Sequence, residues 1–146
     1  MKISTNWLAK FVNISETPSE LAEMLTMLGF EAEVGVDFST MKNIVSAIVI
    51  STKKHPNADK LKLCQVFDGK DELQIVCGAP NVQTGQSVIL AKIGSILPGD
   101  FKIKKAKIRG EESYGMICSE RELGLSDEHE GIMTLNSDIK PGLSIS

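Results

Sequence analysis

The amino-acid sequence predicts a mainly β protein, in which a small closed barrel follows a helical N-terminal segment. Three observations support this fold class. From about residue 40 onward, apolar residues alternate with polar ones or form short runs that glycine and proline separate into five or six strands. Before that point the apolar spacing is helical. The chain has 146 residues, of which 42% are hydrophobic and 24% charged, so it is long enough to bury a core.

Two helices are predicted within residues 1–39. The first covers residues 4–12, where large apolar side chains recur at helical spacing. The second has stronger terminal signals, because Thr17 and Glu20 form a capping box and Gly29 follows the last residue of an apolar stripe. Together the two helices carry too little apolar surface to form a core, so we expect this segment to pack against another part of the protein.

Residues 40–146 are predicted to form the barrel. Asp68-Gly69 is a hairpin signal between two strands, and Leu97-Pro98-Gly99 marks a later turn. A helical turn is expected at residues 119–125. The predicted strands cover residues 43–52, two segments within 60–78, and residues 87–94, 101–108 and 131–135.

Basic residues are concentrated in the middle of an acidic chain. Sixteen Lys and Arg against 19 Asp and Glu give a net charge of −3, which excludes a uniformly basic nucleic-acid binder. Residues 40–110 nevertheless hold twelve basic and five acidic residues, a net charge of +7, whereas residues 1–39 and 111–146 have net charges of −4 and −6. Two interpretations are open: a surface that faces a polyanion, or mutual neutralisation of the segments in the folded chain.

Lysines alternate with apolar residues in the predicted strand 101–108. In such a strand Lys102 and Lys104 point to one face and Ile103 to the other. Lysines on a barrel rim can contact phosphates and release counterions. Alternatively, they only keep a strand face solvated and protect an edge. Because no aromatic residue interleaves with these lysines, we expect contacts to phosphate and RNA shape rather than base stacking.

The sequence gives little support for a metal site, for catalysis or for a membrane segment. Cys64, Cys77 and Cys118 are widely spaced and form no C-x-x-C pair, which argues against zinc and against a disulfide framework. A cysteine nucleophile would need an exposed thiol beside His55 or His129. No apolar run approaches the roughly 18 residues of a membrane helix, and the N-terminus does not resemble a secretory signal.

Four internal stretches, together with the first eight residues, carry a resemblance to a known family. The HPNADKL and RGxxSxGM elements are similar to those of the tRNA-binding OB-fold domain of synthetase-associated proteins. The IVCGAPNV and GMICSxxELGL forms, with the opening MKxSxxWL, resemble the N-terminal region of bacterial phenylalanine–tRNA ligase β subunits, over essentially the whole chain. The motifs occupy residues 54–61, 74–82, 109–119 and 122–125.

This resemblance implies a five-stranded OB-fold barrel over residues 40–146, with residues 1–39 as the first half of a split α/β module. It implies a non-catalytic tRNA-binding module that assists attachment of phenylalanine to its tRNA, in a cytoplasmic α2β2 enzyme that uses ATP and Mg²⁺. The implied partners are tRNA, the α subunit and the remainder of the β subunit, which would continue beyond Ser146. No catalytic residue, resident cofactor, metal ligand or membrane contact is expected in this segment.

Residues in and around the motifs are candidates for contact with tRNA. For Lys54, Lys60, Lys107 and Arg109 a polyanion-facing role is favoured. For the turn residues His55, Asn57, Asp59, Ser113 and Gly115 a structural role is favoured over direct contact. The candidate tRNA-binding set is Lys54, Asn57, Lys60, Lys102, Lys104, Lys105, Lys107, Arg109 and Ser113.

A different class of function stays open, namely a protein-interaction or chaperone-like OB barrel with no direct RNA contact. Pairing of Lys102, Lys104, Lys105 and Lys107 with the acidic segment 111–146 would favour that alternative, because such pairing would leave little free charge for phosphate.

Overall fold

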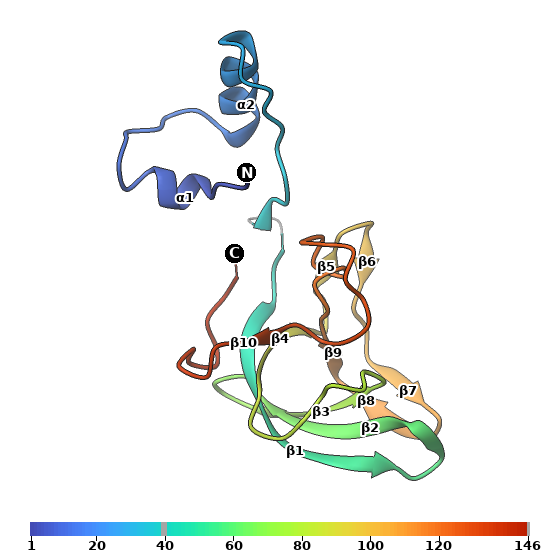
Figure 1. The fold of residues 1–146 in the computed structure, drawn as a ribbon. Helices are drawn as coiled ribbons and strands as arrows, with labels where there is room; N and C mark the ends of the chain where they lie inside the picture. Colours follow the sequence, from blue (N-terminus) through green and yellow to red (C-terminus); the bar gives the residue numbers. More distant parts are fainter. Residues whose placement is uncertain (39–40, 146) are drawn as a thin grey trace. The chain divides into compact units, whose positions relative to one another are not determined.

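The computed structural model describes residues 1–38 and 41–145. It divides into two compact units, Met1–Asp37 and Phe38–Ser146, and each is considered by itself (Figure 1). The boundary predicted between residues 39 and 40 lies outside the described residues.

The first unit begins with the short helix α1, Thr5–Leu8, whose N-cap Ser4 accepts a hydrogen bond from the Trp7 N–H at 3.4 Å. The prediction of a helix over residues 4–12 is too long. After α1 the hydrogen bonds tighten, because the Phe11 N–H donates to the Leu8 carbonyl at 3.0 Å, a three-residue spacing. The Trp7 and Phe11 rings remain in contact, with centroids 4.8 Å apart.

Helix α2, Pro18–Met27, has the predicted capping box. The Glu20 N–H donates to Thr17 Oγ1 at 3.3 Å, and the Thr17 N–H donates to Glu20 Oε2 at 2.8 Å. At the other end the Phe30 N–H reaches back to the Leu25 carbonyl at 3.0 Å, a bond that closes the helix around Gly29. The local signals in this segment therefore predicted its helix correctly.

Neither α1 nor α2 buries a residue within the described part of this unit. Large apolar side chains therefore stay exposed on it, among them Trp7, Phe11, Met24, Met27, Leu28 and Phe30. This agrees with the expectation that the two helices form no core of their own. In residues 1–38 and 41–145 we find no helix with the length and apolar character needed to cross a membrane.

The second unit is a nearly closed antiparallel barrel, as the sequence predicted. Strands β1, β2 and β3 form a meander, β4 pairs with the other edge of β1, and β9 pairs with β4 (Figure 1). The short β10 also pairs with β4, opposite Ser87 and Val88. The bounds are β1 Ile44–His55, β2 Ala58–Phe67, β3 Glu72–Cys77, β4 Ser87–Lys92, β9 Gly115–Ile117 and β10 Thr134–Leu135.

The barrel closes between β3 and the residues that lead into β9. The Tyr114 N–H donates to the Gln74 carbonyl at 2.9 Å, and the Val76 N–H donates to Ser113 Oγ at 3.1 Å. A Cβ at Gly115 would lie 2.7 Å from the Ala91 carbonyl oxygen, so only glycine lets the two backbones approach this closely. Closure of the barrel at β9 therefore depends on the Ser113 hydroxyl and on the absence of a side chain at Gly115.

Two further hairpins precede β9. Strands β5, Ile96–Leu97, and β6, Phe101–Lys102, form the first, and β7, Ala106–Ile108, and β8, Glu111–Ser113, form the second. The prediction of one continuous strand over residues 101–108 is wrong. Ile103 is buried and binds the backbone of Ser95 and Gly94 at 2.8 and 2.9 Å, which divides the segment between the two hairpins.

Aliphatic residues fill the barrel, with two of the cysteines among them. Residues 119–125 form the expected turn, in which the Ser119 hydroxyl accepts the Glu122 N–H at 3.3 Å. The core cluster comprises Ala47, Val49, Cys64, Val66, Ile75, Cys77, Val82, Val88, Leu90, Ile117 and Ile132.

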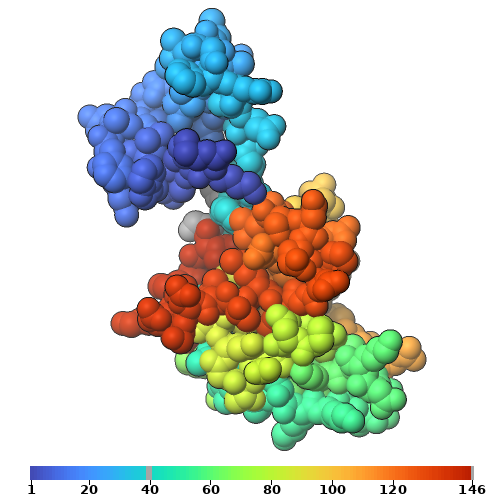
Figure 2. Space-filling model, in the orientation of Figure 1, coloured from blue at the N-terminus to red at the C-terminus, as the bar shows by residue number. Residues whose placement is uncertain are grey.

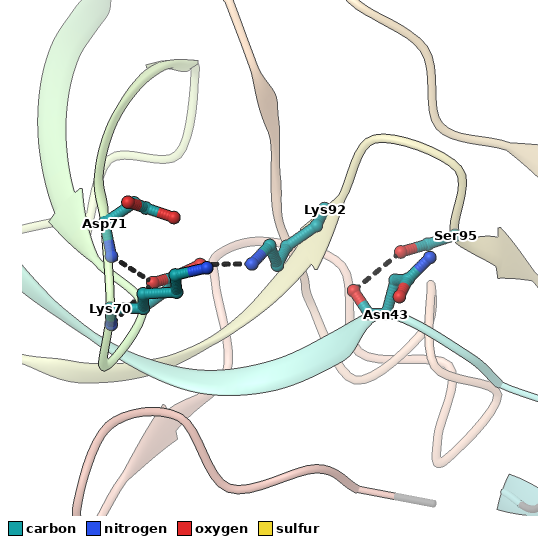
Figure 3. Close-up of polar contacts among 6 residues, drawn as sticks. Asn43, Lys70, Asp71, Lys92 and Ser95 are labelled. Carbon is teal, nitrogen blue, oxygen red and sulfur yellow. Dashed lines mark hydrogen bonds and ion pairs between the residues drawn. The ribbon is translucent and has the colours of Figure 1, made fainter.

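An ion pair with a buried carboxylate and a half-buried lysine joins the β2–β3 turn to β4 (Figure 3). The Asp68 side chain is 0% exposed, accepts the N–H groups of Lys70 and Asp71 at 2.9 and 2.7 Å, and pairs with the Lys92 ammonium. Burial alone would raise the pKa of Asp68. The hydrogen bonds from Asp71, Lys92 and Lys70 together outweigh it and lower the pKa below its usual range. This cluster stabilises the predicted Asp68-Gly69 hairpin.

Candidate nucleic-acid interface

Two turns that are about 50 residues apart in the sequence meet at one edge of the barrel. His55 Nδ1 accepts the Asn57 N–H at 3.1 Å, so the ring proton lies on Nε2, which donates to the Ile108 carbonyl at 3.0 Å. Asn57 Nδ2 donates to the Arg109 carbonyl at 3.0 Å. We call this set, His55, Asn57, Ile108 and Arg109, the turn clamp. It joins the HPNADKL motif to the RGxxSxGM motif.

Arg109 has an unusual backbone conformation at the tip of the β7–β8 hairpin. Its φ is 51° and that of Gly110 is 98°, which is the two-residue turn with both central residues left-handed. Asparagine, aspartate or glycine normally occupies the first position, since a left-handed residue with a Cβ costs about 1–2 kcal/mol. The bond from Asn57 holds this strained carbonyl in place.

The turn clamp brings exposed positive charges together. Lys54 and Lys60 lie on β1 and β2 beside the first turn, and Lys107 and Arg109 lie on the hairpin that is docked against it (Figure 1). Within residues 1–38 and 41–145 these side chains form no ion pair. We call Lys54, Lys60, Lys107 and Arg109 the cationic edge.

Lys105 differs from its neighbours because a carboxylate neutralises it. Its ammonium lies 2.8 Å from Glu112 Oε1 and 4.8 Å from the centre of the Tyr114 ring. The Tyr114 hydroxyl also donates to Glu112. The hydrogen bond to Glu112 raises the pKa of Lys105 and lowers the pKa of Glu112. Of the seven basic candidates, Lys105 therefore has the least free charge to offer a phosphate.

Lys102 and Lys104 lie away from the turn clamp, at the end of β6 and in the link to β7. Both are exposed, and the intervening Ile103 is buried, as the predicted alternation requires. Neither forms an ion pair in the described part of the chain. Lys102 and Lys104 therefore add positive charge to the segment that leads to Arg109, outside the turn clamp.

Two of the candidate residues have clear structural roles. Ser113 is 2% exposed, and its hydroxyl accepts from Val76 and donates to the Gly115 carbonyl at 3.0 Å. Asn57 has its side-chain amide engaged in the turn clamp. For Ser113, burial and a fully used hydroxyl leave nothing for RNA to contact, so we omit it from the proposed interface.

An exposed aromatic residue escaped the sequence analysis. Phe101 directly precedes Lys102, and 56% of its side chain is accessible to solvent. No aromatic residue lies between the lysines, but this ring lies at the start of the same segment. An exposed aromatic ring beside positive charge is one of the features of single-strand binding surfaces.

The three thiols do not support nucleophilic chemistry. Cys64, Cys77 and Cys118 are all buried, and burial raises the pKa of Cys118 to about 12. Among residues 1–38 and 41–145 no group of three His, Cys, Asp or Glu side chains could hold a metal ion. The cysteine-nucleophile hypothesis therefore lacks the exposed thiol that it requires.

A five-stranded antiparallel barrel with a cationic edge on joined loops is typical of OB folds that bind nucleic acids. Comparison with protein families places it more closely. Residues 44–144 match the family described as "Putative tRNA binding domain", and the chain belongs to this family.

The chain is also similar to much longer bacterial proteins. It is 54% identical to the phenylalanine–tRNA ligase β subunit of Geobacter sulfurreducens over 146 residues, which is 99% of this chain and 18% of that protein. The same-named subunits of Desulfotalea psychrophila and Hahella chejuensis are 52% and 46% identical, over 97% and 99% of this chain. The chain thus spans about 18% of the length of these relatives. The resemblance found in the motifs is confirmed.

A solved structure shares the fold. The MetRS related protein from Pyrococcus horikoshii superposes with a TM-score of 0.56 at 20% identity, over 75% of this chain and 93% of that one. At this level of identity the likeness concerns the barrel alone.

Proposed function

We propose that this chain is a non-catalytic tRNA-binding module of a phenylalanine–tRNA ligase β subunit. The family match over residues 44–144 carries the proposal, because it covers the whole barrel. The geometry supports it, since Lys54, Lys60, Lys107 and Arg109 lie on the two turns that the clamp joins. None of the four is within ion-pair distance of a carboxylate in the described residues, and Glu112 faces Lys107 across the β7–β8 hairpin. Phosphate oxygens are the natural partners of such a surface.

The mode of binding follows from the kind of residues at the edge. Lysine and arginine that replace condensed counterions give affinity that falls steeply with salt, by a slope of about 0.7–0.9 per phosphate contact. Four such contacts predict a loss of roughly 50- to 150-fold between 50 and 200 mM salt. The interface would steer and hold tRNA without reading its bases at this edge.

The activity of the longer protein is part of the same proposal. The names of the relatives support a role in attaching phenylalanine to tRNA. In that enzyme ATP and Mg²⁺ would be used outside this segment. We propose tRNA, an α subunit and the rest of the β subunit as partners in an α2β2 assembly, and the cytoplasm as its location.

The N-terminal unit has a separate proposed role. We propose that residues 1–39 are the first half of a split α/β module, completed by chain beyond residue 146. The exposed apolar side chains of the N-terminal unit support this, since an isolated unit with Phe11, Met27 and Phe30 in solvent would gain from burial. The relatives are long enough to supply the missing half.

Charge reversal at the hairpin tests RNA binding directly. Lys107→Glu with Arg109→Glu should weaken tRNA binding in a filter assay at low salt by at least tenfold and reduce the salt slope by about half. Both side chains are exposed, so the fold should survive. Lys10→Glu with Lys42→Glu changes the net charge equally at exposed lysines elsewhere and should have much less effect. Equal losses in the two double variants would contradict the proposed edge.

The alternative, a protein-interaction barrel with no RNA contact, has one observation in its favour. Lys105 does pair with Glu112 of the acidic segment. In the described residues Lys102 and Lys104 form no ion pair, so their charge stays available. Lys107 forms no direct pair either, but it stands opposite Glu112 in the β7–β8 ladder and interacts with that carboxylate. Absence of tRNA binding even at low salt would select this alternative.

A further inference from the structure

A shallow groove lies between the β5–β6 hairpin and the loop that follows β9. Its volume is about 380 Å³, within the roughly 300–1,000 Å³ range of small-ligand sites. Figures 1 and 2 show the orange loop of residues 119–130 beside this hairpin. None of the residues of the turn clamp lines this groove.

One wall of the groove is apolar and contains an exposed ring. Leu97, Pro98 and Phe101 line it, and Leu97 pairs with Phe101 across the hairpin. Leu97 is buried, whereas Phe101 is among the most exposed large apolar side chains of the barrel. The hairpin thus holds the phenylalanine ring at the surface on a buried support.

The opposite wall is polar and has its groups oriented. Glu122 accepts both the N–H and the hydroxyl of Ser119 on Oε2, at 2.6 and 2.9 Å, which fixes the carboxylate. His129 Nδ1 donates to the Asp127 carbonyl at 3.1 Å, which orients the ring. Arg121 supplies a cation to the same wall. Fixed acceptors opposite a ring suit a flat ligand that carries amine donors.

The groove continues directly into the lysine segment. Phe101 is followed by Lys102 and Lys104, and the same stretch of chain ends at Arg109 in the turn clamp. The Glu122 carboxylate disfavours a phosphate inside the groove, whereas the neighbouring lysines attract one outside it. An RNA strand following the lysines would therefore turn its base, rather than its phosphate, toward the ring.

We propose that this groove binds one unpaired base of RNA, stacked on Phe101, with the adjoining phosphates on Lys102 and Lys104. The proposal rests on the proposed RNA-binding function and adds a site to it. It also gives the barrel a preference for single strands that the cationic edge lacks, because a base inside a duplex is already stacked between its neighbours.

The test replaces Phe101 with tryptophan in a chain whose Trp7 is changed to phenylalanine, so that the single indole reports on the groove. A mixed-sequence single strand of about 12 nucleotides should quench the indole as it binds, while a blunt duplex of that length should bind without quenching. Separately, Phe101→Ala should weaken single-strand binding by roughly tenfold and leave duplex binding unchanged. Leu143→Ala, at a similarly exposed side chain, is the control.

Failure of this inference can be told apart from failure of the proposed function. If both RNAs bind, and charge reversal at Lys107 and Arg109 weakens them, but the indole is not quenched and Phe101→Ala has no effect, the groove does not take a base. Loss of self-association in the Phe101→Ala chain, with RNA binding intact, would likewise overturn it in favour of a protein contact. No RNA binding at low salt would remove the proposed function and this inference together.

Discussion

Two charged clusters lie at opposite ends of strand β2, and they differ in what surrounds each charge. At the Phe67 end, Lys92 pairs with a carboxylate, Asp68, that is wholly buried and receives two backbone N–H groups. At the Ala58 end, the turn clamp is built from hydrogen bonds between uncharged groups. The exposed cations beside it form no ion pair in the part of the chain that the structure describes. The lysine at the first end, Lys92, contributes to stability. The lysines at the second end are exposed and available to a ligand. Charge alone does not distinguish these uses, whereas burial and pairing do.

The largest effect should come from breaking the Asp68–Lys92 pair. Asp68→Ala leaves two turn N–H groups without their partner and removes the ion pair of the half-exposed Lys92, and should reduce the free energy of unfolding by about 2 kcal/mol in urea titration. Asp71→Ala, whose exposed side chain is no part of the cluster, should cost less than about 0.5 kcal/mol. If Asp68→Ala also weakens tRNA binding at a temperature at which the variant is folded, the two ends of β2 are not separate in function.

The same pair gives the barrel an acid dependence. Because the pKa of Asp68 is lowered in the folded state, its contribution to stability is fully present above the ordinary aspartate pKa. That contribution is lost as the pH falls through the lowered folded-state value. Asp68→Asn should therefore flatten the decline of unfolding free energy on the acid side, while Asp71→Asn should leave the slope as it is.

The features that could be predicted from sequence are the local ones. The capping box at Thr17 and Glu20, the Asp68-Gly69 turn and the strand periods each depend on residues a few positions apart. The OB-fold assignment required the family resemblance, because five short strands are compatible with several barrels.

The features that could not be predicted depend on distant partners. Residues 101–108 have the pattern of one strand, but Ile103 bonds to the backbone near Ser95 and divides it. Ser113 resembles a contact residue in its motif, but its hydroxyl accepts a hydrogen bond from the Val76 N–H, 37 positions away. Similarly, nothing local to Asn57 reveals that its partner is Arg109. Period and propensity describe one segment at a time, so they cannot assign such pairs.

A smaller effect separates positioning from charge at the turn clamp. Asn57→Ala removes the hydrogen bond to the Arg109 carbonyl and should weaken tRNA binding by about three- to tenfold while costing only about 0.5–1 kcal/mol of stability. Asp59→Ala, on the adjoining strand, removes a negative charge and should bind tRNA slightly better.

NMR relaxation separates a positioning role of Asn57 from a purely structural one. Backbone amides of residues 106–112 should become more mobile by NMR relaxation in the Asn57→Ala chain, while those of the barrel core stay unchanged. Equal loosening of the hairpin and the core, or an unchanged affinity with a mobile hairpin, would contradict a positioning role.

The smallest effect concerns Arg109 itself, where stability and binding should change in opposite directions. Asparagine tolerates a left-handed backbone better than arginine, so Arg109→Asn should raise the free energy of unfolding by about 0.5 kcal/mol. The same change removes one cation from the edge and should weaken tRNA binding about threefold, with the salt slope reduced by about 0.7–0.9. Arg109→Lys keeps both the charge and the strain, so it should resemble the parent chain in each measurement. Backbone strain at an exposed cation is consistent with a binding role for its side chain. An Arg109→Asn chain that is more stable and binds tRNA equally well would leave that strain without a function.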